Sequence, residues 1–442
     1  MVRVCLSHWD AQVRELGAAA LQRIVSEDTG LAQDVVHALV PAARSTDHEA
    51  AHGALLALAA VSKAVSAVRP EALDAALGVS PRLFATPGAA AVIAAACRIV
   101  ATSSSHAPSR LTLLLHAATQ RPEHFVHDAV AAMLGALPAY SAAAYVDEVL
   151  DTWLSLSPEA QQCAAQALGA VRLGVRDRER LELLVGIVDA SVTADVDTRA
   201  RAAASIPHLA ACDIGKATAA LVCGLDDHTS DERGDVGSWV RAASATALAD
   251  TLCTHPTSEA RAAYVAMAGG VMERIDAVRV VACEALACVA RVCPVPAADR
   301  VRQLLSGSVE RYRDAHTAFS AVMPLLDVAA YRPALVATLA RTIGSRSETA
   351  RRDAAPALVQ WAQGASCENV SAFVRALDSL AARHMRDNRL FVPVAHTTLA
   401  LLDGGVHVDF SPMFRRATAH LAQIKSVPRL LAALRLYVIE KY

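Results

Sequence analysis

One short segment has the residue types and spacing of a zinc peptidase. His48-Glu49-Ala50-Ala51-His52 matches the pattern His-Glu-x-x-His, which on a helix places two imidazoles on one face and a glutamate beside a metal-bound water. The third metal ligand is the weak point. Leu58 occupies the position where one class of these enzymes has a third histidine, and Glu71 follows Pro70 in a short alanine-rich segment. We therefore keep a zinc peptidase only as a distant alternative.

Other candidate groups give weaker patterns. Cys283, Cys288 and Cys293 recur at every fifth residue, so on a helix their side chains spread around the axis and do not converge on a metal. His124 and His127 share a helix face but have no third ligand nearby in the sequence. The phosphate-binding Gly-x-x-x-x-Gly-Lys-[Ser/Thr] loop and the Gly-x-Ser-x-Gly nucleophile elbow are both absent. The sequence predicts no catalytic residue, no metal and no cofactor, and we expect a binding protein and not an enzyme.

The most unusual stretch is an acidic loop over residues 226–238, which reads DDHTSDERGDVGS. Gly234 and Gly237 permit turns that other residues resist. Asp235 or Ser238 is expected to cap the following helix by accepting backbone amide hydrogen bonds. We expect Asp235 and Arg241 to act mainly in a ladder of contacts between repeats.

The remaining acidic residues of this loop exceed what a helix cap requires. Irregular loops on a rigid stack of helices are where binding surfaces tend to lie. The loop therefore predicts a partner-binding surface. We assign to this surface Asp227, Asp231, Arg233, Gly234, Asp235, Gly237, Trp239 and Arg241.

The elements that must position this loop are helices arranged in repeats. A charged or polar residue followed by alanines and a leucine returns about every 38 residues, which is the period of a two-helix solenoid repeat. The pattern predicts an all-α fold, an α-solenoid of HEAT/armadillo-type helical repeats. We expect one continuous array over residues 1–442 with about eleven repeats. Clear copies start at Asp10, Trp239, Asp276 and Arg351, and looser ones centre on His52, Asp128, Gln162, Arg201, His316 and Arg389.

Composition agrees with this fold and excludes some functions. Hydrophobic residues make up 54% of the chain but aromatic residues only 4%, so alanine, leucine and valine must form the core. With 42 basic and 44 acidic residues and a net charge of −2, the chain lacks the basic stripe of a nucleic-acid scaffold. The uncharged stretch 129–146 contains Gly135 and Pro138, so it does not qualify as a membrane span. Ten cysteines without a Cys-x-x-Cys pair favour a reducing compartment, the cytoplasm.

Neither end of the sequence supplies an obvious capping repeat with a polar outer face, which solenoids need. Residues 1–6 enter a repeat at once, and residues 430–442 form an apolar segment that stops. Two interpretations stay open. The chain is either a piece of a longer protein or a gene product that has lost its flanking repeats.

The acidic loop also carries a family resemblance. Residues 227–241, DHTSDERGDVGSWVR, resemble the signature loop of the tubulin-folding cofactor D family, also called tubulin-specific chaperone D. His228 stands where that family commonly has an aromatic residue. The resemblance covers most of the chain and corresponds to the central and C-terminal part of the longer family members. Further matching stretches are 8–10 with 13–16, 46–47 with 52–54, 134–138, 323–327 with 331–333, and 391–393 with 401–402.

The resemblance implies a cytoplasmic chaperone associated with the microtubule cytoskeleton. Members of this family bind β-tubulin after the chaperonin and help to join it to α-tubulin. Their partners are the tubulin-folding cofactors E and C and an Arf-like small GTPase, and the assembly activates GTP hydrolysis by tubulin. No nucleic acid, membrane span or cofactor is implied. The alternative on the same architecture is a generic HEAT-repeat adaptor scaffold.

Overall fold

The computed structural model describes residues 2–102, 108–172, 174–190, 192–257, 261–345, 348–384, 388–406, 408–412, 415 and 432. Within these ranges the regular structure is helical, and a single β-bridge joins Asp231 to Gly234. The predicted all-α repeat fold is confirmed. The chain forms two compact units, Met1–Asp213 and Ile214–Tyr442, and each is described by itself. The single array of about eleven repeats stays a prediction.

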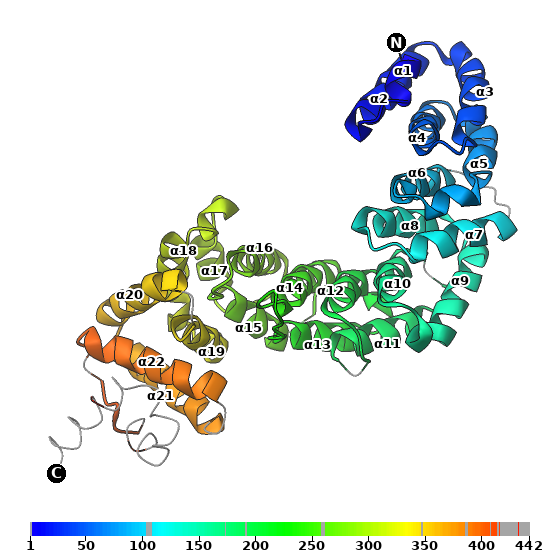
Figure 1. The fold of residues 1–442 in the computed structure, drawn as a ribbon. Helices are drawn as coiled ribbons and strands as arrows, with labels where there is room; N and C mark the ends of the chain where they lie inside the picture. The colour runs from blue at the N-terminus through cyan, green and yellow to red at the C-terminus, as the bar shows by residue number, and fades with distance from the viewer. Residues whose placement is uncertain are drawn as a thin grey trace. The chain divides into compact units, whose positions relative to one another are not determined.

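In the first unit, every second helix packs on the next to form one row, namely α2, α4, α6, α8, α10 and α12. Helices α3, α5 and α7 pack against one another and against this row, and α11 covers α12 (Figure 1). The bounds are α1 (Val2–Leu6), α2 (Ala11–Glu27), α3 (Ala32–Ala43), α4 (His48–Ala64), α5 (Arg69–Leu77), α6 (Ala89–Ala101), α7 (Pro108–Thr119), α8 (His124–Ala136), α9 (Ala139–Thr152), α10 (Pro158–Ala170), α11 (Asp177–Val188) and α12 (Val196–Ser205).

In the second unit, α14 packs on α16, α18 on α20, and α20 on α22, while α15 contacts α13, α16 and α19. The bounds are α13 (Ile214–Gly224), α14 (Gly237–Thr254), α15 (Arg261–Gly270), α16 (Asp276–Val292), α17 (Ala298–Leu304), α18 (Ala315–Val322), α19 (Arg332–Ile343), α20 (Glu348–Gly364), α21 (Cys367–Arg383) and α22 (Asn388–Asp403). Within the described ranges of both units, every helix is too short or too polar to span a lipid bilayer.

Small residues let neighbouring helices approach closely in both units. In α4, the alanines and leucines between Ala51 and Leu58 are fully or almost fully buried. A Cβ atom added to Gly53 would lie 1.7 Å from the carbonyl oxygen of Leu6, so only glycine permits this approach of α4 to α1. Alanine has the highest helix propensity, and the alanine-rich composition therefore serves both helix formation and close packing.

Side-chain hydrogen bonds join equivalent positions in neighbouring repeats. The Nε of Arg14 donates to the Nδ1 of His52 at 3.0 Å, and the two residues are 38 apart. The Nε2 of Gln166 donates to Oδ1 of Asp128 at 2.6 Å, again across 38 residues. The period found in the sequence is therefore the spacing between stacked repeats.

A recurring arginine fastens each of several helices to the turn that precedes it. Arg14, Arg279 and Arg332 lie in or at the first turn of α2, α16 and α19. Each donates hydrogen bonds to the two carbonyl oxygens five and six residues earlier, at 2.5–3.4 Å. Charged donors make the stronger class of protein hydrogen bond. The arginine thereby satisfies backbone groups that the turn would otherwise leave without a partner.

Candidate partner-binding site

The predicted acidic loop connects α13 to α14 and is ordered by its own backbone. Oδ1 of Asp227 accepts a hydrogen bond from the amide of Thr229 at 2.9 Å, which makes an Asx turn. Asp231 and Gly234 exchange two backbone hydrogen bonds of 2.9 and 3.0 Å around a tight turn. Gly234 has φ 110°, a left-handed conformation that favours glycine. The loop therefore has a defined shape.

The tip of the loop presents an arginine and a tryptophan to solvent. Both oxygens of the Asp231 carboxylate accept from Arg233, from its backbone amide at 2.8 Å and from its guanidinium at 2.8 and 3.0 Å. These hydrogen bonds lower the pKa of Asp231. Arg233 in turn stacks over Trp239, with its Cζ 5.0 Å from the ring centroid, in a cation–π contact. Trp239 stays 43% exposed. Arginine and tryptophan are the residue types enriched at protein interfaces.

The base of the loop is a buried, charge-balanced cluster of two carboxylates and two guanidiniums. Arg241, which is 2% exposed, binds both oxygens of Asp235 at 3.0 and 3.1 Å and donates to the carbonyl oxygen of Asp227 at 2.5 Å. Arg274, from the next repeat, reaches Oδ2 of Asp235 at 2.5 Å. Oε2 of Glu273 lies 3.2 Å from the Nε of Arg241. This cluster ties the loop to its own helix and to the following repeat.

Two members of the cluster, Asp235 and Arg241, have pKa values shifted toward their charged forms despite burial. Burial alone would raise the pKa of the Asp235 carboxyl, but the hydrogen bonds and charges of Arg241 and Arg274 outweigh it, and the pKa is lowered. Burial likewise opposes the charged form of Arg241, but Asp235 and Glu273 raise its pKa above the ordinary value. Because its carboxylates and guanidiniums are paired with one another, the loop base holds the loop against α14 and the following repeat.

The structure corrects one expectation about this loop. Helix α14 has Val236 at its N-cap position, and no side chain caps the helix. The carboxylate of Asp235 instead binds Arg241 through two hydrogen bonds and Arg274 through one, and the bidentate pair with Arg241 adds geometric specificity to the charge. The hydroxyl of Ser238 donates to the carbonyl oxygen of Asp235 at 2.7 Å, so it is a donor here. The prediction of a cap at either residue was wrong.

Gly237 permits the loop to fold back on itself. A Cβ atom at this position would lie 2.5 Å from the carbonyl oxygen of Asp227 and 2.8 Å from the amide of Thr229. The Gly237 amide also donates to the carbonyl oxygen of Thr229 at 2.8 Å. The predicted site residues thus divide in two. Asp231, Arg233, Gly234 and Trp239 form the exposed tip, whereas Asp227, Asp235, Gly237 and Arg241 build the base.

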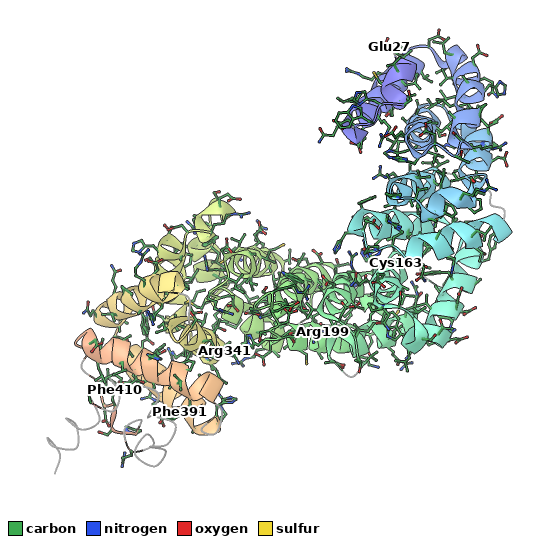
Figure 2. The ribbon with its side chains drawn as sticks, in the orientation of Figure 1. Glu27, Cys163, Arg199, Arg341, Phe391 and Phe410 are labelled. Carbon is green, nitrogen blue, oxygen red and sulfur yellow. The ribbon has the colours of Figure 1, made fainter. Side chains whose placement is uncertain are left out.

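The sequence prediction missed the residues that reach the loop from elsewhere. Oδ1 of Asp226 lies 3.3 Å from Nε2 of His228 and 3.2 Å from Nη1 of Arg341 on α19 (labelled in Figure 2), 115 residues away. The hydrogen bond from His228, followed by the charge of Arg341, lowers the pKa of Asp226. These residues, with Arg241 and Glu273, line a pocket of about 220 Å³. Arg274 follows Asp235 by 39 residues, so the repeat period could have found it, but no sequence signal marks Arg341.

Most of the second unit matches a known protein family. Residues 263–427 match the family model described as tubulin folding cofactor D C terminal. Over these residues the chain is similar to that family. The matched range contains Glu273, which pairs with Arg241, and Arg274 and Arg341, which contact the acidic loop. The loop itself, residues 226–238, lies before the matched range. The family resemblance of residues 227–241 therefore stays a prediction.

Comparison with solved structures gives matches of low sequence identity. Kap121p bound to Pho4p is similar at 12% identity and a TM-score of 0.40, over 96% of this chain and 49% of that chain. Kap121p alone gives 12% identity and a TM-score of 0.35, over 95% and 52%. An engineered protein gives 19% identity and a TM-score of 0.32, over 91% and 98%. The chain spans about half the length of the Kap121p chains it matches.

The second histidine of the zinc-peptidase pattern at the start of α4 takes part in a contact between neighbouring repeats. His52 is 5% exposed, and its Nδ1 accepts the hydrogen bond from Arg14. Burial, followed by the charge of Arg14, lowers the pKa of His52 to about 4. A guanidinium at this nitrogen opposes the approach of a divalent cation. Over the part of the chain that the structure describes, no three His, Cys, Asp or Glu side chains are grouped to hold a metal ion.

Proposed function

We propose that this chain is a tubulin-folding cofactor that binds β-tubulin and helps to assemble the αβ-tubulin heterodimer after the chaperonin. The observation that carries the proposal is the match of residues 263–427 to the cofactor D C-terminal family. The proposed partners are cofactors E and C and an Arf-like small GTPase, with which the chain activates GTP hydrolysis by tubulin. The proposed place of action is the cytoplasm, at the microtubule cytoskeleton.

The architecture supports a binding role. Stacked helical repeats offer extended surfaces for a folded client, and a specific interface of about 1,600 Å² needs no deep pocket. We assign part of this surface to the loop tip, because the Arg233–Trp239 stack is held in place by Asp231 and lies outside the buried anchor. A side chain that is already ordered loses less entropy on binding.

Co-elution tests the function directly. The purified chain is mixed with αβ-tubulin, with cofactor E and with the Arf-like GTPase, singly and together, and each mixture is separated by size exclusion. Co-elution with tubulin, alone or in the mixture, supports the proposal. A helical, monodisperse chain that co-elutes with none of them overturns it and leaves the generic HEAT-repeat adaptor as the better description.

A double variant tests the loop tip within the same assay. Replacing Asp231→Ala together with Arg233→Ala is expected to weaken tubulin binding about tenfold, with helical content and melting temperature nearly unchanged. The matched control is Glu310→Ala with Arg313→Ala, an exposed ion pair of similar length at 2.7 Å. Equal affinities for the two double variants would remove the loop tip from the binding surface. A large loss of stability in the loop variant would make the tip structural.

A further inference from the structure

Two thiols from neighbouring repeats face each other in the second unit. Cys253 lies in the last turn of α14 and Cys288 in the C-terminal half of α16. Their Sγ atoms are 3.4 Å apart, and both residues are partly exposed. Among the described residues, this is the one place where two sulfur atoms are recorded in contact. The α14–α16 pair is also among the most extensively packed helix pairs of the chain.

The neighbouring cysteines differ from this pair. Cys283, on the same helix as Cys288, is buried, and Cys293 is buried with its thiol donating to the carbonyl oxygen of Leu252 at 3.5 Å. Because the Cys283 thiol is buried, it is protected from reagents in solution. The pair of Cys253 and Cys288 therefore combines contact with access.

We propose that Cys253 and Cys288 form an oxidation site, at which a low-molecular-weight disulfide such as oxidised glutathione converts the two thiols into a disulfide between neighbouring repeats. The Cys288 thiolate attacks one sulfur of the glutathione disulfide and releases one glutathione thiolate. The Cys253 thiolate then attacks Cys288 in the mixed disulfide and releases the second. Two protein protons are lost, two reduced glutathione molecules form, and the electrons balance.

The order of the two steps follows from the surroundings of Cys253. Burial, followed by the hydrogen bond with Cys288, raises the pKa of Cys253 to about 12. The thiolate is the attacking species, so Cys253 is suited to the second, intramolecular step, where proximity offsets a small ionised fraction. The two sulfur atoms must approach by about 1.4 Å to reach a bonded distance of about 2.05 Å.

The disulfide would fix the α14–α16 interface at one end. Arg241 and Arg279 anchor the first turns of these two helices, and the proposed link joins them near their last turns. The helix pair that supports the acidic loop would then be held at both ends. This inference rests on the sulfur contact alone and does not depend on the proposed tubulin-binding function.

The experiment measures thiols in the full chain. The reduced protein is incubated with oxidised glutathione at neutral pH, free thiols are blocked, and the protein is cleaved after arginine and glutamate. Glu284 lies between Cys283 and Cys288, so this cleavage separates the two cysteines. We expect a peptide pair linked through Cys253 and Cys288, which dithiothreitol separates again into two free-thiol peptides.

A matched set of variants keeps the inference testable. Cys288→Ser should abolish the linked peptide pair, and Cys367→Ser, at an exposed cysteine on α21, should leave it unchanged. A wild-type chain in which Cys253 is linked to a cysteine other than Cys288 overturns the assignment. So does a wild-type chain in which Cys253 and Cys288 stay reduced, or each carry glutathione, under conditions that modify the exposed Cys223 and Cys367.

Discussion

Replacing Arg241 with methionine should be among the most damaging single changes in the second unit. Methionine fills similar space but donates no hydrogen bond, so Asp235 loses its bidentate partner and the carbonyl oxygen of Asp227 loses its donor. Glu273, whose side chain is 8% exposed, loses the guanidinium beside Oε2. Removing one partner from a buried ion pair costs about 3–5 kcal/mol, because the remaining charge stays buried without compensation. Arg274 still neutralises Asp235, so we expect the lower part of this range.

The assay is urea unfolding followed by circular dichroism, with hydrogen exchange of peptides from the loop and α14 to locate the loss. Arg233→Met is the matched control, since the same substitution eight residues earlier removes an exposed pair with Asp231 and a stack over the partly exposed Trp239. Its free energy of unfolding should change by no more than about 0.5 kcal/mol. If Arg241→Met loses less than about 1 kcal/mol, or no more than Arg233→Met, the loop base is not an anchor and the reasoning fails.

Three further predictions concern titration and backbone geometry. Burial and Arg14 lower the pKa of His52 to about 4, from an ordinary 6.5. The first unit should therefore lose stability as pH falls from about 6.5 to 4, by at most about 1.4 kcal/mol per pH unit. In thermal melts, His52→Gln, which can still accept from Arg14, should show a weaker dependence of melting temperature on pH. The pKa of Asp235 is lowered, so its contribution to stability is present above about pH 4 and is lost as pH falls further. Asp235→Asn should therefore reduce the loss of melting temperature below about pH 4. An unchanged loss would mean that other carboxylates cause it. Gly237→Ala should open the loop, as seen by faster hydrogen exchange around Thr229, because its Cβ would overlap the Asp227 carbonyl; Gly364→Ala, where a Cβ meets no atom within 4 Å, should not.

Much of the fold was predictable because the sequence pattern that specifies it is local and repeats at a fixed period. The alanine-rich helices, the period of about 38 residues and the arginine near the start of several helices are all visible in the sequence. Arg14 and His52 stand one period apart in direct contact. The acidic loop was also predictable as a departure from that period. Its glycines mark the positions where the backbone needs left-handed geometry or close approach, at Gly234 and Gly237.

The site was harder to predict because its partners come from distant positions. Local rules assign Asp235 to a helix cap, but it binds two guanidiniums instead, and one of them comes from the next repeat. Arg341 reaches Asp226 across 115 residues, which no periodic pattern indicates. The contact between Cys253 and Cys288 likewise depends on how α14 lies against α16, whereas the sequence shows only scattered cysteines.

The arginines that bind the turns before several helices determine where this chain can accommodate insertions and deletions. Arg14, Arg279 and Arg332 bind carbonyl oxygens five and six residues earlier, whereas Arg241 spans 14 residues to Asp227. Because the anchor holds both ends of the turn, added residues extend outward and the helix keeps its place in the stack. A peptide inserted between Glu232 and Arg233 should therefore lie on the surface and leave the stability of the helical core unchanged. Natural variation in loop length can accumulate at this position for the same reason.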